Sequence, residues 1–293
     1  MTQTLEKPRI RRQRDGINHV VFSADGSSFV YSDVHMNLVF PNGVTRSLTS
    51  INPKVKAIER IRAVAISQDG TRVSATAGDQ VFEFSMETGE MLWSYSPPRN
   101  WGFLIVSPLA LAASHSGLLA ASTDNGQILI WPSDRSSMRK LRVNDNPWQM
   151  FFAGNSEELV IQESFTVSRI DLESGEMSMR FELPDKCYGM ALSPDGSMIA
   201  VRTLSRVYLL DGYKGRVIWR RQVQAGLPLL AFNPATPMLA VGENYFVSLL
   251  DLDGKEIDQV SVQHSELVSM GFHPSGSELV LGLSNHEIVR HAV

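Results

Sequence analysis

Residues 188–222 read YGMALSPDGSMIAVRTLSRVYLLDGYKGRVIWRRQ, and this stretch decides the fold. It contains four runs rich in apolar and β-branched residues, which we expect to be strands at 188–192, 198–203, 206–210 and 217–222. The turn between the first two runs ends in an Asp-Gly pair, and glycine accepts the positive φ of a tight turn without a steric penalty. Four short strands joined by tight turns predict an antiparallel meander.

The same arrangement recurs seven times along the 293-residue chain. The first residues of the seven turns are Ser23, Ser67, Ser114, Ala153, Ser193, Asn233 and His273. Their spacings are 44, 47, 39, 40, 40 and 40 residues, and self-similarity at this period is typical of a β-propeller. We therefore predict an all-β fold: a seven-bladed β-propeller with four-stranded blades, formed by residues 1–293 as a single domain.

A second glycine keeps the same period. Gly89, Gly175 and Gly215 each lie 22 residues after the first residue of their unit's first turn, which places them between the third and fourth strands. The second strands, such as 198–201 and 238–241, are almost wholly apolar. Such runs are expected for strands that are buried on both faces between neighbouring blades.

The seventh unit ends at Val293 after only three strands. The unassigned segment 5–13 can supply a fourth, so we predict that this N-terminal strand pairs beside residues 287–291 and closes the ring. The basic residues of this region are Lys7, Arg9, Arg11, Arg12 and Arg14. Lysine and arginine protect an exposed edge strand from mispairing, and we prefer that role to phosphate binding.

Composition narrows the class of protein. With 27 basic and 31 acidic residues the net charge is −4, so binding to nucleic acid through overall charge is not expected. No apolar run is long enough to cross a bilayer and none follows the basic N-terminus, so we expect neither a membrane span nor a signal peptide. The single cysteine, Cys187, cannot form an intrachain disulfide, which favours a reducing, cytoplasmic location.

The repeat resembles those of WD40 and YVTN-type propellers. Residues 121–131 of the third unit run Ala-Ser-Thr-Asp-Asn-Gly-Gln-Ile-Leu-Ile-Trp, like the strand, Asp-containing turn and Trp-ending strand of that family. No unit has the family's Gly-His pair, and Pro132 follows Trp131 where the family has Asp, so the Trp-Ser/Thr-His-Asp tetrad is incomplete in every blade. The resemblance implies a non-enzymatic scaffold that binds another protein on its loops.

Two units also resemble quinoprotein-type repeats, which have a tryptophan four residues after a turn glycine. Gly89 with Trp93 and Gly215 with Trp219 have this spacing, whereas most units do not. Many members of that family have vicinal cysteines, which a chain with one cysteine cannot form. We therefore expect no cofactor and assign both tryptophans to packing of the fourth strand.

Two insertions interrupt the period. The interval from the second turn glycine to the next unit's first turn is 18 or 19 residues in units four to six, but 24 after Gly43 and 25 after Gly89. Insertions in a repeat protein lie on one face, often the binding face. These loops combine basic and aromatic residues, which are preferred at interfaces. The residues that we select as partner-binding are Lys54, Lys56, Arg60, Arg62, Arg99, Trp101 and Trp148, with Tyr188 and Tyr245 as secondary candidates across the ring.

Other interpretations stay open at this point. Trp101 and Trp148 could instead cover the top of the ring, with the lysines solvated. The sequence has no nucleophile elbow, zinc-protease motif or phosphate-binding loop, and we select no catalytic or metal-binding residue. An enzyme, or a small-molecule or metal binder, of lactonase or quinoprotein type at the central channel is the alternative, and a self-assembling subunit is a third possibility. We expect Cys187 to be buried, and the acidic residues near the rim to be solvated; these are Glu163, Glu243, Glu266 and Glu287.

Overall fold

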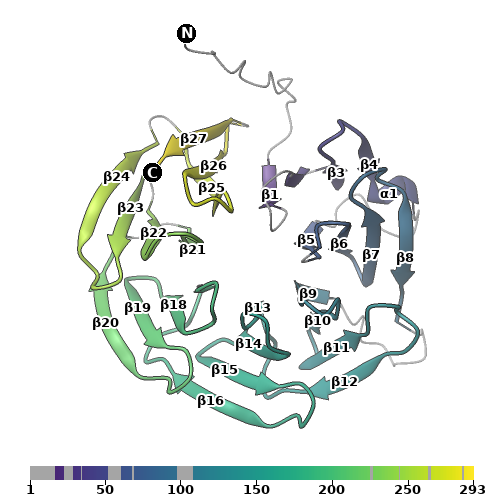
Figure 1. Ribbon diagram of the computed structural model, residues 1–293, viewed down its shortest axis with the longest axis horizontal. Helices are drawn as coiled ribbons and strands as arrows, with labels where there is room; N and C mark the ends of the chain where they lie inside the picture. Colours follow the sequence, from purple (N-terminus) through teal and green to yellow (C-terminus); the bar gives the residue numbers. More distant parts are fainter. Residues whose placement is uncertain are drawn as a thin grey trace.

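The structure is a computed structural model that describes residues 17–22, 29–33, 35–51, 61–67, 69–97, 108–224, 227–243, 245–262, 265–285 and 287–293. Their strands, β1 to β27, form seven antiparallel sheets arranged as the blades of a ring (Figure 1). The prediction of an all-β, seven-bladed propeller is confirmed. Helix α1 (Leu48–Ile51), the only helix among the described residues, has four residues.

Within each blade the strands follow one another in chain order from the centre of the ring to its edge (Figure 1). Blades 1 to 3 comprise β1 (Ile17–Phe22), β2 (Phe29–Asp33), β3 (Asn37–Val39), β4 (Thr45–Ser47); β5 (Ile61–Ile66), β6 (Arg72–Ala77), β7 (Gln80–Ser85), β8 (Met91–Tyr95); and β9 (Pro108–Ala113), β10 (Leu119–Thr123), β11 (Gln127–Trp131), β12 (Arg139–Arg142). Blades 4 and 5 comprise β13 (Gln149–Phe152), β14 (Glu158–Gln162), β15 (Thr166–Asp171), β16 (Met177–Glu182); and β17 (Gly189–Leu192), β18 (Met198–Arg202), β19 (Arg206–Asp211), β20 (Val217–Gln222). Blades 6 and 7 comprise β21 (Leu230–Phe232), β22 (Met238–Gly242), β23 (Phe246–Asp251), β24 (Glu256–Ser261); and β25 (Leu267–Phe272), β26 (Glu278–Leu283), β27 (Ile288–Ala292).

The first turn of blade 5 shows why the Asp-Gly pair recurs. Gly196 has a φ of +72°, and a Cβ at this position would lie 3.2 Å from Ala153 of the neighbouring blade. Asp195 Oδ1 accepts hydrogen bonds from the Ser193 hydroxyl at 2.7 Å and from the Ser197 amide at 3.0 Å. These bonds hold the pKa of Asp195 below its ordinary value. The turn is therefore closed by its own residues.

The hydrophobic core lies between blades. Ile199 and Val201 of β18 are fully buried and belong to one cluster with Val160 and Val167 of blade 4. Burial of such a side chain stabilises the fold by about 1.5–3 kcal/mol. Stacking of neighbouring sheets therefore supplies the core, as the apolar second strands predict.

The tryptophans of the quinoprotein-like spacing serve in packing. Trp93 lies edge-on to the buried Trp131 of blade 3, with ring centroids 5.3 Å apart. Trp219 Nε1 donates a hydrogen bond to the Leu252 carbonyl oxygen of blade 6 at 2.8 Å. Both side chains thus join neighbouring blades, as expected from the sequence.

The first and last blades meet where β1 packs against β25 and β26. Among the described residues blade 7 has three strands. Segment 5–13, which we expect to add the fourth strand and close the ring, lies outside the described residues, so this closure stays a prediction. Within the described part of the chain no helix is both long and apolar enough to span a membrane.

Connections alternate between the two faces of the ring because neighbouring strands are antiparallel. The turns between first and second strands and between third and fourth strands lie on one face, which we call the turn face. The turns between second and third strands lie on the other, the loop face. The loops from each outer strand to the next inner strand are also on the loop face. Both insertions are loops of this last kind, although residues 52–60 and 98–107 lie outside the described residues.

Candidate protein interface

Blades 4 to 6 present large apolar side chains on the loop face. Each blade contributes one residue from the loop before its inner strand and one from the turn between its second and third strands. These residues are between 46 and 62% exposed, whereas four of the five residues in each second strand (β14, β18 and β22) are buried. We call this set the apolar arc; its members are Trp148, Phe165, Tyr188, Leu204, Leu227 and Tyr245.

Trp148 is exposed on a backbone that two blades hold in place. Its amide donates a hydrogen bond to the Gln162 carbonyl oxygen of its own blade at 2.8 Å. The carbonyl oxygen of the preceding residue, Pro147, accepts a 2.7 Å bond from the hydroxyl of Ser122, a fully buried residue at the end of β10 in blade 3. The backbone that carries Trp148 is therefore held from both sides, and the residue itself is half-exposed.

Tyr188 repeats this arrangement one blade further on. Its amide donates to the Arg202 carbonyl oxygen at 2.8 Å. The carbonyl oxygen of Cys187 accepts a 3.1 Å bond from Nε2 of Gln162, which is buried at the end of β14 in blade 4. Ser122 and Gln162 lie 40 residues apart, one repeat period. The same position in successive blades thus anchors the next blade's loop.

Arg202, at the end of β18 in blade 5, occupies the equivalent position one repeat further along the chain. Its side chain is fully buried and its guanidinium donates to the carbonyl oxygens of Gly242 and Gln224 in blade 6 and the loop before it, the latter at 2.8 Å. Burial lowers the pKa of this guanidinium, and the charge of Glu243 opposes that shift. A buried cation so tied to two carbonyl oxygens fixes the loop that leads to Leu227.

Two acidic residues of the loop face are buried, contrary to our expectation of a solvated acidic rim. Glu163 is 2% exposed and accepts hydrogen bonds from the Asp145 amide at 2.8 Å and the Thr166 hydroxyl at 2.6 Å. Glu243 is 6% exposed and accepts a 2.8 Å bond from the Gln224 amide. The expectation was wrong because both carboxylates serve as acceptors for backbone amides of the neighbouring loop. Two others, Glu266 and Glu287, are exposed.

The residues selected from the sequence fall into two groups. Lys54, Lys56, Arg60, Arg99 and Trp101 lie outside the described residues. Arg62 is exposed near the start of β5, and Trp148, Tyr188 and Tyr245 belong to the apolar arc.

Three members of the arc escaped sequence reasoning. Phe165, Leu204 and Leu227 occupy short connections, where single apolar residues have no periodic pattern to mark them. One signal in the sequence could have identified Phe165. It lies 80 residues, or two repeat periods, before Tyr245, so both aromatic residues occupy the same turn of their blades.

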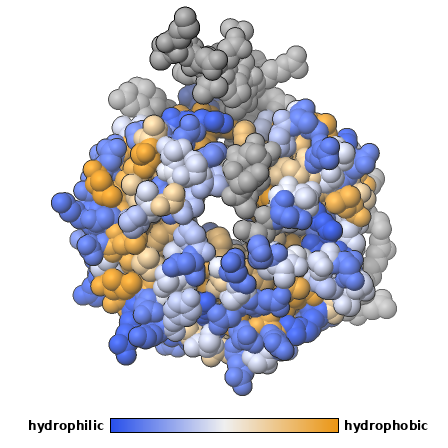
Figure 2. Space-filling view, in the orientation of Figure 1, coloured by the Kyte–Doolittle hydropathy of each residue, from blue (hydrophilic) through white to orange (hydrophobic). Residues whose placement is uncertain are grey.

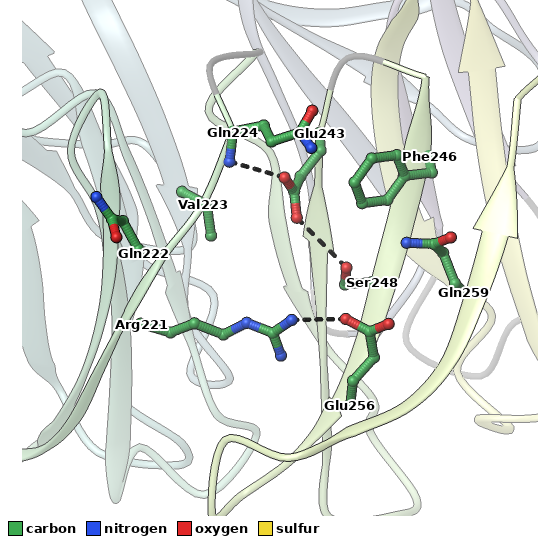
Figure 3. Close-up of a pocket in the computed structure, with 9 residues that line it drawn as sticks. All are labelled: Arg221, Gln222, Val223, Gln224, Glu243, Phe246, Ser248, Glu256 and Gln259. Atoms are coloured by element: carbon green, nitrogen blue, oxygen red, sulfur yellow. Dashed lines mark hydrogen bonds and ion pairs between the residues drawn. The ribbon is translucent and has the colours of Figure 1, made fainter.

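A groove of about 410 Å³ lies between blades 5 and 6 (Figure 3). Figure 3 shows Gln224 and Glu243 at one end, Arg221 and Glu256 at the other, and Phe246 beside them. The guanidinium of Arg221 and the carboxylate of Glu256 form an ion pair at 2.6 Å. The full lining is Arg221, Gln222, Val223, Gln224, Glu243, Phe246, Ser248, Glu256 and Gln259.

Cysteine and metal-ligating side chains are two kinds of reactive group. Cys187 is buried, as expected, and burial raises the pKa of its thiol to about 12, so it stays protonated at neutral pH. Across the described ranges no group of three or more His, Cys, Asp or Glu side chains is placed to hold a metal ion.

Comparisons with known proteins leave the family open. No protein-family model matches the chain, and a search of curated proteins finds no match. The argument for function therefore depends on the geometry of the loop face and on the sequence resemblance described above.

Proposed function

We propose that this protein is a non-enzymatic, WD40-like interaction module that binds another protein on its loop face. The apolar arc carries the proposal, because six large apolar side chains are half-exposed on one face of three consecutive blades. Clustered apolar surface on a folded protein marks an interaction site more often than scattered residues do. Trp and Tyr are also the side chains that contribute most to binding at interfaces.

The hydrogen bonds beneath the arc favour tight binding. Ser122, Gln162 and Arg202 fix the loop backbones before any partner arrives. These loops then lose less conformational freedom when a partner docks, which is the main advantage of a preorganised surface. The rigid ring supplies the scaffold and the arc supplies the contacts.

We extend the proposed interface to the inserted loops. By sequence they are the loops that lead into blades 2 and 3, so they belong to the same face as the arc. The residues that we include from them are Lys54, Lys56, Arg60, Arg62, Arg99 and Trp101. Their basic charge would suit acidic groups on the part of the partner that lies beyond the arc.

The test compares two sets of exposed tyrosines. Tyr188→Ala with Tyr245→Ala removes two aromatic rings from the arc, whereas Tyr213→Ala removes a 55% exposed ring from the turn face. Each tagged variant, confirmed as folded by circular dichroism, is expressed in the native cell and crosslinked before purification. We expect the Tyr188/Tyr245 variant to lose a partner that wild type and Tyr213→Ala both retain. An identical set of crosslinked proteins for all three would overturn the proposal.

Self-assembly through the edge of the ring is a second candidate. Exposed apolar residues lie at the start of several outer strands: Met91 and Leu92 of β8, Met177 of β16, Val217 and Ile218 of β20, and Ile257 of β24. Figure 2 shows hydrophobic surface over β23 and β24 at the edge of the ring. Light scattering tests this candidate: a mass above 32.5 kDa that Ile218→Lys with Ile257→Lys returns to the monomer value would support it.

The channel alternative, a lactonase-like or quinoprotein-like enzyme or small-molecule binder, gains no favourable observation. The ring has a central opening (Figure 2), but Glu163 and Glu243, two of the acidic residues expected near the rim, have their carboxylates engaged by backbone amides. We therefore rank it below partner binding.

A further inference from the structure

One position of the outer strand can be compared between blades, because it faces the next blade at each junction. In blade 5 this residue is Trp219, which pairs with Leu209 across the sheet. The indole packs against a buried cluster that includes Leu209, and its Nε1 bonds to the Leu252 carbonyl oxygen of blade 6. Blades 2 and 4 place Trp93 and Met179 in the same register. A large apolar side chain therefore suits this junction.

Blade 3 has an arginine at this position. Arg139 of β12 pairs with Ile130 of β11, in the register of Trp219 in blade 5. Its guanidinium donates to the carbonyl oxygen of Leu172, which lies 80 residues, or two repeat periods, before Leu252. The arginine thus makes the hydrogen bond of the tryptophan without supplying its ring.

A cavity of about 350 Å³ lies beside Arg139, between blades 3 and 4. It opens on the turn face, since most of its lining comes from the first turns of the two blades and from the turns between their third and fourth strands. Ile130, which lines the cavity, is the counterpart of Leu209 beneath Trp219. The apolar walls are Leu118, Ile130, Pro132 and Met138.

The lining suits a neutral aromatic ring that carries an N–H group. Its charged residues are Arg139, Glu157 and Glu173, with Asp171 in electrostatic reach of Arg139. This excess of carboxylates disfavours an anion, and the apolar walls would strip water from a cation. A guanidinium attracts the face of an aromatic ring. Glu157 accepts a 2.7 Å bond from the Ser116 hydroxyl, and its carboxylate has further acceptor sites for an indole N–H.

The open rim of the cavity favours a protein over a free compound. Arg139, Glu157 and Glu173 are exposed, so the cavity covers only part of a ligand. Small-molecule sites bury most of their ligand, whereas a protein segment covers the rest of a ring with its own surface. We propose that this cavity accepts the tryptophan side chain of a partner protein. The site lies on the turn face, so it goes beyond the proposed function and stands without the apolar arc.

N-acetyltryptophanamide is the probe, observed by NMR through ¹³C-labelled methionine methyl groups of the full-length protein. Met138 lines the cavity, and Met138→Leu assigns its signal. We expect a ring-current shift of this signal that saturates with a Kd on the order of 1 mM, as for the burial of one side chain. N-acetyl-leucinamide and N-acetyl-lysinamide should bind at least about fivefold more weakly.

Two substitutions on β12 form a matched pair, and both positions are exposed. Arg139→Trp fills the cavity from within and should abolish the shift, whereas Arg142→Trp adds the same ring on the opposite face of the strand and should keep it. The reciprocal change, Trp219→Arg, should create a second site that shifts Met198, which packs against the same cluster. The β12 pair decides the test even if Trp219→Arg does not fold.

Random-peptide display on the full-length protein distinguishes a protein occupant from a free aromatic compound. We expect the peptides that N-acetyltryptophanamide displaces to contain a tryptophan, and to bind at least about tenfold more weakly when it is replaced by alanine. They should not bind Arg139→Trp. Binding to Tyr188→Ala with Tyr245→Ala should be normal, which separates this site from the proposed function.

Three results would overturn the inference. They are equal binding of the leucine or lysine analogue, a probe shift that persists in Arg139→Trp, and probe binding with which no tryptophan-containing peptide competes. In the last case the occupant would be a free aromatic compound. Failure of the apolar arc to bind any partner would overturn the proposed function alone.

Discussion

The two faces of this ring are built in different ways. On the turn face, each turn is first closed locally: Asp195 accepts hydrogen bonds from the Ser193 hydroxyl and the Ser197 amide, and Asp69 accepts them from Ser67 and Thr71 in the same manner. The preceding blade adds further bonds, as Arg169 does to the Gly196 carbonyl oxygen at 2.9 Å. On the loop face, connections are held by the preceding blade. A local sequence motif therefore closes the turns of one face, whereas the loops of the other face depend on bonds from neighbouring blades.

This difference has a functional consequence. A turn that is closed by hydrogen bonds among its own residues needs only short polar side chains, and similar residues occur at this turn in several blades. A loop held from beneath by buried side chains can present large apolar residues to solvent without losing its conformation. The loop face is accordingly where the apolar arc lies, and four tests examine how firmly this distinction holds.

The largest expected effect is on the loop face. Arg202→Met removes a fully buried guanidinium and leaves the carbonyl oxygens of Gly242 and Gln224 without a donor. We expect the free energy of unfolding to fall by about 3 kcal/mol in urea titrations. The matched control is Arg206→Met, which breaks the exposed ion pair with Asp185 and should cost less than about 1 kcal/mol. Equal losses for the two variants would show that the loop face is not anchored in this way.

A smaller effect is expected on the turn face. Gly196→Ala places a Cβ at a φ of +72° and 3.2 Å from Ala153, so we expect a loss of about 1–2 kcal/mol in the free energy of unfolding. Gly43→Ala is the control, because its φ of +81° is similar but no atom lies within 4 Å of the added Cβ. Binding of a partner that needs the apolar arc should be unchanged in Gly196→Ala. A loss of binding would contradict the independence of the two faces.

A still smaller effect is expected in the pH dependence of the free energy of unfolding, which should differ between a loop-face histidine and a turn-face aspartate. Burial holds the pKa of His19, whose Nδ1 is 2.9 Å from the Ser32 hydroxyl, below its ordinary value of 6.5. The unfolded chain then binds a proton more readily, so the free energy of unfolding should fall as pH drops from about 6.5 through the pKa of the folded state. Asp195, whose pKa is also lowered, contributes stability that is lost only below about 3.8.

Urea titrations between pH 7 and 5 check this assignment. His19→Asn should flatten the pH dependence of the free energy of unfolding. If the variant keeps the wild-type slope, another group is responsible.

The last test concerns the Cys187 thiol, which we expect not to react in the native state. Cys187 directly precedes Tyr188 in the same loop and its thiol is buried, with a pKa of about 12 that keeps it protonated. We expect no measurable labelling by a thiol reagent at pH 7 in the native state, and complete labelling in urea. Fast native labelling would show that this loop opens, and Gln162→Ala is expected to raise the labelling rate because it removes the bond to the Cys187 carbonyl oxygen.

Residues 188–222 show how far the sequence predicts the fold. The four strands of blade 5 match the predicted ranges to within one residue, because Asp-Gly turns and apolar second strands are local signals. The site was predicted less well. Trp148, Tyr188 and Tyr245 were selected as exposed aromatics, but Leu204 was not, since its exposure depends on how neighbouring blades pack.

The error at Glu163 and Glu243 has the same origin. A glutamate in a short connection is ordinarily solvated, and nothing nearby in the chain indicates otherwise. The amides that bind these carboxylates belong to Asp145 and Gln224, which lie 18 and 19 residues earlier along the chain. Such partners become visible only in the folded ring.

The sequence by itself determined the seven-fold period, the strand order of each blade and the tight turns of one face, because each depends on residues a few positions apart. The tertiary structure decided the loop face. Ser122, Gln162 and Arg202 reach the loops of the next blade only after the sheets stack, and that stacking leaves the apolar arc exposed above them. Local hydrogen bonding explains the first result, and burial between blades explains the second.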